Sequence, residues 1–463
     1  MGPTVLIMAA GEGTRMRSSL PKVLHPVCGR PMVAWPVIAA REAGAERIAV
    51  IVSPDRDLTA GLPEGTETVI QPEADGTGGA IRAAHDIVRD SDTVVVLSGD
   101  HPLINAEIVG ALLETHRAAA AGATVMTVEL DDPSAYGRIV RDADGDIEAI
   151  VETKNPEEVD PEVLAIREIN TGTYAFAAEP LMEALDQLTN DNSAGEYYLG
   201  DVLPMLRRDG LRVVAHRATD PNVNLGVNNR VDLAAVTAEA RHQILEHHML
   251  DGVTIIDPLT TWIEAEVEIA ADATIEPGCS LRGSTSIGAD SIIGPHSTLI
   301  DTSVGEQARV VQSHLDRAKV GNLAVVGPFA HLRPDAEIGQ RAKAGAFVEI
   351  KKSTIGEGAK VPHLAYVGDA EVGEGANVGA GAITANYDGR AKHPTKIGEG
   401  ARIGVNNSLV APVDIGAGAY TGAGAVIRED VPDGALGVSS NEQRNIEGYA
   451  ERKAEASDAE GAE

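Results

Sequence analysis

A period of six residues runs through the second half of the chain and constrains its fold more than any other feature. Apolar side chains recur at every sixth position, in four runs separated by slips of phase: Ile269, Ile275, Leu281, Ile287, Ile293 and Leu299; Val320, Val326, Leu332 and Ile338; Ile355, Val361 and Val367; and Ile397, Ile403, Leu409 and Ile415. This period fits neither an α-helix nor a simple alternating strand. It is typical of a parallel β-helix, in which each hexad forms one face of a triangular coil and its apolar residue fills the interior.

The first 230 residues have a different pattern, in which short apolar runs alternate with amphipathic stretches. This pattern predicts buried strands at 5–9, 48–52, 94–97 and 125–128, and helices at 80–88 and 106–120. Strands that alternate with helices predict a mostly parallel sheet with helices on both faces. Residues 137–141 and 147–151, with Asp144-Gly145 between them, predict a hairpin.

These patterns divide the chain into four expected parts. They are an α/β domain over 1–229, a linker helix over 230–252, a hexapeptide-repeat domain over 253–450 and a disordered acidic tail over 451–463. The helix is expected because Asn228-Asn229 is a natural N-cap and residues 231–249 contain neither Gly nor Pro. The tail is rich in Ala and Glu and has no large apolar residue with which to form a core.

Composition limits the functions that such a chain can have. Its 463 residues exceed the ~150 typical of one domain, and 38 basic residues against 70 acidic ones give a formal net charge of −32. This surface charge repels phosphate polymers and excludes a general nucleic-acid binder. Any phosphorylated substrate must therefore be held locally, by particular Arg, Lys or backbone N–H groups or by a metal.

Two features of the sequence indicate the cellular compartment of the protein. Cys28 and Cys279 are too few for a disulfide framework, which favours a reducing environment. The apolar run at 5–10 is too short for a signal-peptide core or a membrane span, and no basic segment precedes it. We therefore expect a cytoplasmic protein without a stable membrane anchor.

A glycine-rich segment follows the first predicted strand and reads Ala9-Ala10-Gly11-Glu12-Gly13-Thr14-Arg15-Met16, with Pro21-Lys22 shortly after it. Glycines at the end of a first strand let backbone N–H groups face a phosphate, although a lone Gly-x-Gly also fits a plain turn. Arg15 and Lys22 favour the phosphate site, because a triphosphate and its pyrophosphate leaving group require cations. Asp100, in Ser98-Gly99-Asp100 at another strand end, either binds Mg²⁺ or merely caps a helix.

The spacing of Gly-x-Gly-Thr-Arg-Met and Pro-Lys resembles that of the sugar-1-phosphate nucleotidyltransferases, which have a Rossmann-like sheet. Over roughly residues 4–450 the chain resembles a family of bacterial bifunctional enzymes, N-acetylglucosamine-1-phosphate uridyltransferases that are also glucosamine-1-phosphate acetyltransferases. The resemblance implies acetylation of glucosamine-1-phosphate by acetyl-CoA, then uridylyl transfer from UTP with release of pyrophosphate. It also implies a left-handed β-helix, a Mg²⁺ requirement, a homotrimer and a place in peptidoglycan and cell-wall synthesis.

The resemblance assigns residues in the first domain as well. Arg15 and Lys22 would act in catalysis, and Asp100 and Asn228 would bind Mg²⁺. The residues that it implies for UTP and UDP-N-acetylglucosamine are Met8, Ala9, Ala10, Gly11, Lys22, Gln71, Gly76, Thr77, Ser98, Gly99, Asp100, Gly137, Glu152, Asn170 and Asn228.

In the second domain the hexads break at residues 384–390, which predicts a projecting loop. A random histidine is usually structural or solvated, but the resemblance makes His363 the general base for the sugar amino group. It implies that glucosamine-1-phosphate is bound by Arg333, Lys351, Tyr366 and Asn377, and acetyl-CoA by Ala380, Asn386, Tyr387, Val405 and Ala423. These residues are coils apart in one chain and could meet in a cleft between subunits. The family often has Ser where this chain has Val405, so a hydroxyl contact is absent there.

Three alternatives stay open. A single-activity nucleotidyltransferase, such as an ADP-glucose or GDP-mannose pyrophosphorylase with a structural hexapeptide domain, would not need His363 or Lys351. A non-catalytic scaffold of the same architecture would be expected to lose Lys22 or Asp100. A zinc carbonic anhydrase could use His331 and His363, but the cations beside them suit an anionic sugar better than Zn²⁺.

Overall fold

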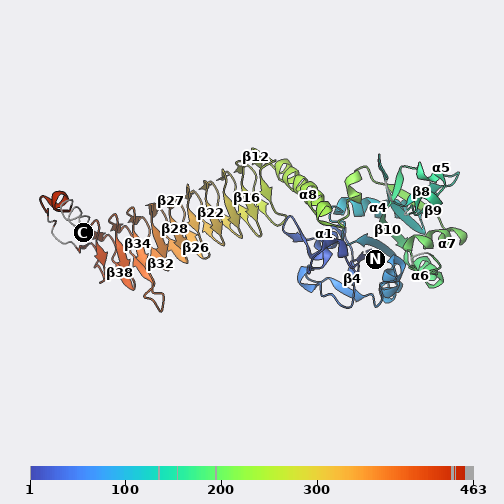
Figure 1. Ribbon diagram of the computed structural model, residues 1–463, viewed down its shortest axis with the longest axis horizontal. Helices are drawn as coiled ribbons and strands as arrows, with labels where there is room; N and C mark the ends of the chain where they lie inside the picture. Colours follow the sequence, from blue (N-terminus) through green and yellow to red (C-terminus); the bar gives the residue numbers. More distant parts are fainter. Residues whose placement is uncertain are drawn as a thin grey trace, which may run out of the picture. The chain divides into compact units, whose positions relative to one another are not determined.

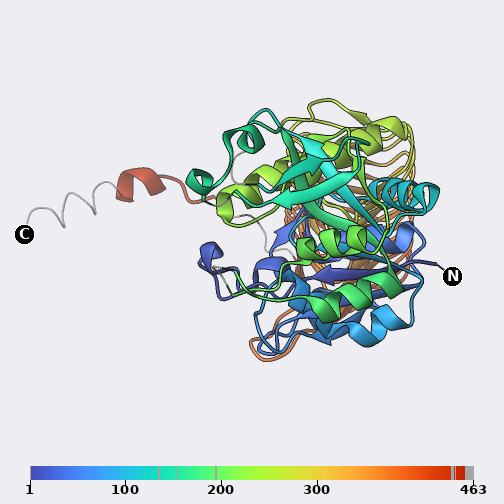
Figure 2. The ribbon, with the colours of Figure 1, turned by 90° about the vertical axis from the view of Figure 1, so that its right-hand side faces the viewer.

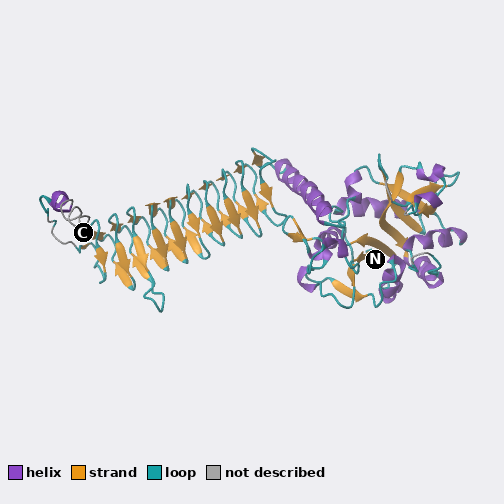
Figure 3. Ribbon diagram, in the orientation of Figure 1, coloured by secondary structure: helices purple, strands orange, loops and turns teal. Residues whose placement is uncertain are grey.

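The computed structural model describes residues 2–133, 136–153, 155–192, 195–439, 443 and 445–453. Its internal contacts divide the chain into two compact units. One unit is Met1–His247 with Ile263–Glu266, and the other is His248–Trp262 with Val267–Glu463. The first unit mixes helices and strands, whereas the second consists mostly of short strands (Figure 3). Most of the tail for which we expected disorder, residues 454–463, lies outside the described residues.

A nine-stranded sheet forms the centre of the first unit, in the order β11-β7-β10-β6-β1-β4-β5, with β8 paired to β10 and β9 paired to β8. Its strands are β1 (Thr4–Met8), β4 (Arg47–Val52), β5 (Glu67–Ile70), β6 (Thr93–Ser98), β7 (Ala123–Glu129), β8 (Arg138–Arg141), β9 (Ile147–Val151), β10 (Glu168–Ala177) and β11 (Val213–Arg217). Strand β1 is parallel to β4 and β6, whereas β10 runs antiparallel to β6 and β7. The predicted mostly parallel sheet is confirmed, and β8 and β9 form the predicted hairpin.

Helices cover both faces of this sheet (Figure 2). The helices of the chain up to residue 250 are α1 (Ala34–Glu42), α2 (Thr77–Ala83), α3 (His85–Arg89), α4 (Ala106–Ala119), α5 (Pro161–Leu164), α6 (Ala178–Gln187), α7 (Val202–Arg208) and α8 (Arg230–Leu250). Val5 and Ile7 of β1 belong to a core cluster with α1 and α4, while Leu6 belongs to a cluster with α2, α3, α6 and α7. Because both faces are buried, the strands form continuous apolar runs in the sequence. No helix in the described part of the chain is long and apolar enough to cross a membrane.

Helix α8 begins at a capping box and packs on the first unit. The side-chain oxygen of Asn229 accepts hydrogen bonds from the backbone N–H groups of Val231 (2.7 Å) and Asp232 (3.1 Å). In return, Asp232 Oδ2 accepts from the backbone N–H groups of Asn228 (2.9 Å) and Asn229 (3.2 Å). The buried side of the helix belongs to a cluster of Met16, Val27, Cys28, Met32, Leu103, Val227, Val236 and Ala240. Most of the helix that we expected to be a linker is thus part of the first unit.

The second unit is a stack of coils, each made of three short parallel strands (Figure 1). An eleven-stranded sheet contains β12 (Thr254–Ile255), β15 (Thr274–Ile275), β18 (Ile292–Ile293), β21 (Arg309–Val310), β24 (Val325–Val326), β27 (Lys343–Ala346), β30 (Lys360–His363), β33 (Asn377–Val378), β36 (Arg402–Ile403), β39 (Tyr420–Thr421) and β41 (Leu436–Gly437). A ten-stranded sheet contains β13 (Trp262–Ile263), β16 (Ser280–Arg282), β19 (Thr298–Ile300), β22 (His314–Asp316), β25 (His331–Leu332), β28 (Glu349–Lys351), β31 (Tyr366–Gly368), β34 (Ile383–Ala385), β37 (Ser408–Val410) and β40 (Val426–Ile427). A nine-stranded sheet contains β14 (Glu268–Ile269), β17 (Ser286–Ile287), β20 (Ser303–Val304), β23 (Lys319–Val320), β26 (Ala336–Ile338), β29 (Ser353–Ile355), β32 (Ala370–Val372), β35 (Thr395–Ile397) and β38 (Val413–Ile415).

The apolar residue of each predicted hexad lies inside this stack. Leu281, Leu299 and Ile355, for example, have no exposed surface. Ile269, on β14 at the end of its sheet, is only half-buried. The prediction of a hexapeptide β-helix is therefore confirmed, and its parallel sheets agree with the left-handed class.

Candidate active sites

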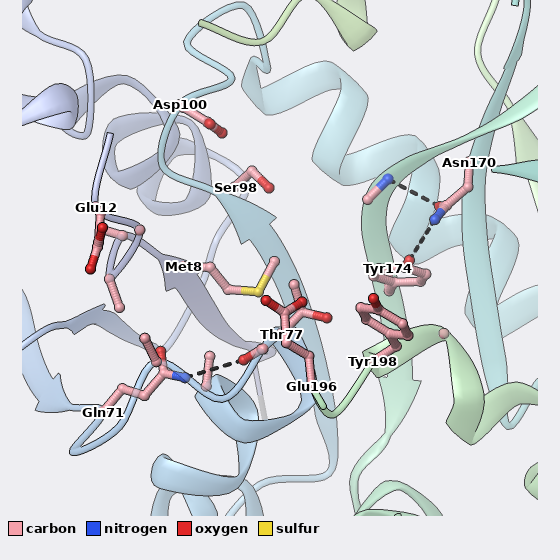
Figure 4. Close-up of a pocket in the computed structure, with 18 of the residues that line it drawn as sticks. Met8, Glu12, Gln71, Thr77, Ser98, Asp100, Asn170, Tyr174, Glu196 and Tyr198 are labelled. Carbon is pink, nitrogen blue, oxygen red and sulfur yellow. Dashed lines mark hydrogen bonds between the residues drawn. The ribbon is translucent and has the colours of Figure 1, made fainter. Parts of the chain in front are cut away.

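A cavity of about 640 Å³ lies at the carboxyl ends of β1 and β6 in the first unit (Figure 4). The two strands are parallel neighbours with Met8 opposite Ser98, so the segments that follow them lie side by side. Twelve of the predicted nucleotide-site residues line the cavity, namely Met8, Ala9, Ala10, Gly11, Lys22, Gln71, Gly76, Thr77, Ser98, Asp100, Glu152 and Asn170. It is also lined by Glu12, Val23, Ala74, Ala80, Ile150, Gly172, Tyr174, Glu196, Tyr198, Gly200 and Asp201, which the sequence did not single out. Gly99, Gly137, Asn228 and Arg15 do not line it.

The glycine-rich loop holds Lys22 at the cavity. Gly13 has a φ of +63°, and a Cβ at this position would lie 2.6 Å from the Cβ of Lys22. Any other residue would therefore force Lys22 away from the loop. From the other side, Arg56 Nη1 donates a hydrogen bond of 3.0 Å to the carbonyl oxygen of Gly11.

Lys22 and Asp100 form an ion pair at the edge of the cavity, with Nζ and Oδ2 2.5 Å apart. Burial alone would raise the pKa of the Asp100 carboxyl, but His101 and Lys22 more than offset it, so the pKa lies below its ordinary value. Asp100 is therefore a carboxylate at neutral pH and can serve as a metal ligand.

Arg15 and Asn228 form a second pair of cation and oxygen, in which Arg15 Nη2 donates to Asn228 Oδ1 at 2.8 Å. The backbone N–H of Val227 donates to the carbonyl oxygen of Asp100 at 3.0 Å, and this bond brings the segment that carries Asn228 beside Asp100. A carboxylate and an amide oxygen are ligands of the kind that Mg²⁺ takes, with water and phosphate oxygens as the others. Asp100 and Asn228 therefore fit the predicted Mg²⁺ site.

Polar and aromatic side chains line the opposite side of the cavity (Figure 4). Asn170 Nδ2 donates to the Tyr174 hydroxyl at 2.8 Å, and Asn170 Oδ1 accepts from the Gly172 N–H at 3.0 Å. Burial raises the pKa of Tyr174 to about 12, so its phenol stays neutral. Burial also raises the pKa of the Asp201 carboxyl. This side offers hydroxyl and amide groups suited to a sugar.

In the second unit, three predicted sugar-phosphate residues come from successive coils of the ten-stranded sheet. Arg333 follows β25, Lys351 ends β28 and Tyr366 begins β31, and these strands are neighbours in the sheet. The backbone N–H of Arg333 donates to the Ile350 carbonyl oxygen at 2.8 Å. The β-helix thus brings together residues that are coils apart in the sequence. Asn377 lies on β33 of the eleven-stranded sheet.

Asp369, which the sequence did not predict, connects these residues to the projecting loop. Its Oδ2 accepts a hydrogen bond from Asn386 Nδ2 at 2.6 Å and lies 3.7 Å from Lys351 Nζ. Asn386 Nδ2 is also 3.4 Å from the Tyr366 hydroxyl. Lys392 lies beside Lys351, and this contact lowers the pKa of Lys392. Two adjacent ammonium groups suit an anionic ligand such as a phosphate.

His363 and three predicted acetyl-CoA residues lie at one corner of the β-helix, between the eleven-stranded and ten-stranded sheets. Backbone hydrogen bonds connect the corner from coil to coil: Gly381 N–H to His363 O (3.3 Å), Asn406 N–H to Ala380 O (2.7 Å) and Gly424 N–H, next to Ala423, to Val405 O (2.8 Å). The imidazole of His363 is exposed, as are Val405 and the predicted loop residue Tyr387. His363, Val405 and Ala423 therefore form an open face at this corner, whereas Tyr387 lies on the loop that follows β34, at the other end of the ten-stranded sheet's strands.

The two histidines of the carbonic anhydrase alternative do not share a sheet. His331 lies on β25 of the ten-stranded sheet and His363 at the end of β30 in the eleven-stranded sheet. Among the described residues, no group of three or more His, Cys, Asp or Glu side chains is placed to hold a metal ion. This geometry does not favour a zinc centre in the β-helix.

Comparisons with known proteins agree with the fold of both units. Residues 5–208 match a family model described as a MobA-like NTP transferase domain, and residues 394–429 match the bacterial transferase hexapeptide, six repeats. The chain is 47% identical over 456 residues to the bifunctional protein GlmU of Streptomyces avermitilis, covering 97% of this chain and 94% of that one. It is 45% identical to the proteins of the same name from Corynebacterium efficiens and Mycobacterium tuberculosis, again over 97% of this chain and over 94% and 92% of theirs. A solved UDP-glucose pyrophosphorylase, at 18% identity and a TM-score of 0.42 over 52% of this chain, adds nothing to the assignment.

The fold and the two sites define a nucleotidyltransferase joined to a hexapeptide-repeat transferase. The relatives match this architecture over nearly their whole length, which confirms the resemblance stated from the sequence motifs. The chain belongs to the family of the bifunctional GlmU proteins.

Proposed function

We propose that this chain makes UDP-N-acetylglucosamine in two reactions. The second unit acetylates glucosamine-1-phosphate with acetyl-CoA, and the first unit then joins the product to UMP from UTP and releases pyrophosphate. We assign uridylyl transfer to residues 1–229 and acetyl transfer to residues 253–450. Membership of the bifunctional family over 97% of the chain supports both assignments.

In uridylyl transfer, a phosphate oxygen of N-acetylglucosamine-1-phosphate attacks the α-phosphorus of UTP, and the bond to the β-phosphate breaks. The protein supplies no nucleophile, so its contribution is alignment and neutralisation of charge. Lys22, which lines the cavity, and Arg15, which lies beside Asn228, would neutralise the triphosphate, and Asn170 and Glu152 would orient the sugar. Asp100 and Asn228 would hold Mg²⁺, which when bound neutralises phosphate oxygens. The observation that carries this proposal is that each candidate ligand oxygen already lies beside a cation, Asp100 beside Lys22 and Asn228 beside Arg15.

In acetyl transfer, the 2-amino nitrogen of glucosamine-1-phosphate attacks the thioester carbonyl of acetyl-CoA, and the carbon–sulfur bond breaks. His363 takes the proton that the nitrogen loses, and coenzyme A leaves as the thiol after protonation. Arg333 and Lys351 hold the sugar phosphate, since both cations lie on one face of the ten-stranded sheet. Asn386, which Asp369 holds beside Tyr366, would contact acetyl-CoA.

Incubation with glucosamine-1-phosphate, acetyl-CoA, UTP and Mg²⁺, followed by mass analysis, tests the whole proposal. UDP-N-acetylglucosamine is the expected product, and omission of acetyl-CoA should abolish it. A single-activity nucleotidyltransferase would instead form this product only when N-acetylglucosamine-1-phosphate is supplied. A non-catalytic scaffold would form none from either sugar.

The acetyltransferase face is open in one chain, and we propose that a cytoplasmic homotrimer completes it. Phe329, Phe347 and Leu364 are exposed at the same corner as His363, and the two phenyl rings stack with centroids 5.1 Å apart. A contiguous exposed apolar surface of this kind is typical of a protein interface. The product would serve peptidoglycan and cell-wall synthesis. Light scattering of the purified chain tests the assembly.

Replacement of Asp232 by Ala should weaken the Mg²⁺ response of uridylyl transfer. The Asp232 carboxylate holds the backbone of Asn228 and caps α8. Loss of an outer-shell partner typically costs about 10–100-fold in metal affinity, and loss of a helix cap costs roughly 0.5–2 kcal/mol of unfolding free energy. Titration of activity with Mg²⁺ and thermal melting measure the two effects. Glu246→Ala, an exposed position on the same helix, is the matched control, and an unchanged Mg²⁺ response in Asp232→Ala would contradict the positioning role.

Replacement of Val405 by Ser should improve acetyl-CoA binding. Val405 is 47% exposed, so it is not a packed hexad residue and its loss opens no cavity. A new neutral hydrogen bond contributes roughly 0.5–1.5 kcal/mol, which lowers the KM for acetyl-CoA by about two- to tenfold. Val405→Ala, which removes bulk without adding a hydroxyl, separates this effect from steric relief. Equal KM values for the Ser variant and wild type would show that position 405 does not contact the cofactor.

A further inference from the structure

Between its polar groups, the sugar side of the nucleotide-site cavity carries a patch of apolar and aromatic surface, which we call the wall. Ile150, Tyr174, Tyr198 and Gly200 all line the cavity, and Figure 4 shows the rings of Tyr174 and Tyr198 close together beside Asn170. Tyr174 belongs to the main core cluster of the first unit, and Ile150 packs against that cluster. The wall is therefore fixed in shape.

Gly200 has no side chain and therefore leaves a gap in this wall. Neither its backbone conformation nor its packing requires a glycine at this position. It lies in a short 3-10 helix, Leu199–Asp201, and its φ is outside the left-handed region that favours glycine. A Cβ at Gly200 would meet one atom within 4 Å, Ile150 Cδ1 at 3.8 Å, which is ordinary contact. Gly76 is the contrasting case, with a φ of +102° and a Cβ that would lie 2.6 Å from the Tyr197 carbonyl oxygen.

Ile150 is held at the gap by a second glycine. A Cβ at Gly137 would lie 2.9 Å from Ile150 Cγ2, so the Ile150 side chain packs directly on the bare backbone of Gly137. Because Gly137 precedes β8 and Ile150 lies on β9, the hairpin itself fixes this contact. The space beside Gly200 is thus bordered by the Ile150 side chain, which packing holds in place.

We propose that Gly200 lets the uridylyltransferase site accept 2-acylamino sugar-1-phosphates with acyl groups longer than acetyl. This inference rests on the proposed uridylyl transfer and extends its substrate class. The acyl methyl is the alkyl group that N-acetylglucosamine-1-phosphate presents outside its ring, and an apolar wall suits it. A closely fitted pocket discriminates one methylene by roughly 10–200-fold. Space beside Gly200 removes that penalty, while the phosphate that reacts stays in place.

The test compares N-acetyl-, N-propionyl- and N-butyryl-glucosamine-1-phosphate as substrates of the full-length chain with UTP and Mg²⁺. Release of pyrophosphate gives kcat/KM for each. Wild type should prefer acetyl over propionyl by less than about fivefold, below the discrimination of a fitted pocket. Gly200→Val should fill the gap and raise that preference at least about tenfold. Gly110→Ala, on α4 with no atom near the new Cβ, is the matched control and should leave the ratio unchanged.

Each result has a clear meaning. A wild-type preference for acetyl of about fivefold or more overturns the inference, as does an unchanged ratio in Gly200→Val. If the Val variant does not fold or uses neither substrate, Gly200→Ala must show the same direction of change, and an unchanged ratio there also overturns it. If wild type did not turn over N-acetylglucosamine-1-phosphate, the proposed function itself would be wrong. If wild type turned over the N-acetyl substrate but not the longer ones, only this inference would be wrong.

Discussion

Asp100→Asn should abolish uridylyl transfer and leave acetyl transfer intact. The substitution replaces the charged carboxylate that pairs with Lys22, and that is assigned to Mg²⁺, by a neutral amide. Loss of a single preorganised electrostatic contact typically lowers kcat by about 10²–10³-fold, and here the negative charge at the metal ligand and the ion pair with Lys22 are lost together. Pyrophosphate release with saturating UTP measures the first activity, and release of the coenzyme A thiol measures the second.

The acetyl-transfer rate of the same variant is the internal control, because its candidate residues all belong to the second unit. Asp90→Asn, an exposed carboxylate of the first unit, controls for the loss of one acidic charge. If both activities fell while thermal melting showed an intact fold, the assignment of two separate sites would fail. Uridylyl transfer near the wild-type rate would show that Asp100 is only a helix cap.

The β-helix could be predicted because its signal is local and repeated. Each coil places an apolar residue in the same environment, so one period describes many strands, and only the end strand β14 leaves its hexad residue, Ile269, half-buried. The helix boundaries were predicted less accurately. The helix expected at 80–88 instead begins at Thr77 and is interrupted at Ala84, where ψ is 18°. The pair Gly78-Gly79 in its first turn gave no helical pattern, yet it allows close packing there.

The nucleotide site was predictable only in part, for a physical reason. Residues near the glycine-rich loop share one stretch of sequence, and their spacing indicates a phosphate site. Tyr198 and Gly200 reach the same cavity through contacts between distant segments, such as Leu199 N–H to Thr77 Oγ1 at 3.0 Å across 122 positions. No local pattern contains such a contact. Asp369 was missed for the same reason, since its role depends on the stacking of coils.

His363→Ala should lower acetyl transfer by roughly 10²–10⁴-fold, the usual loss when a general base is removed. His363 is exposed at a corner of the β-helix and contributes no packing to its core, so the fold should persist. Its backbone carbonyl, which accepts the coil-to-coil hydrogen bond from Gly381, is unchanged by the substitution. Release of the coenzyme A thiol at saturating substrates measures the loss, and pyrophosphate release should stay at the wild-type rate.

A matched control comes from the β-helix itself. His296 lies at the same corner several coils earlier, between β18 and β19, and is also exposed. His296→Ala should leave both activities unchanged, because no predicted substrate residue lies near it in the stack. A large loss of acetyl transfer in both variants would point to a general effect of the corner on assembly. A rate for His363→Ala within about threefold of wild type would be far from the loss expected for a base, and proton removal would then have to be assigned to another group or to water.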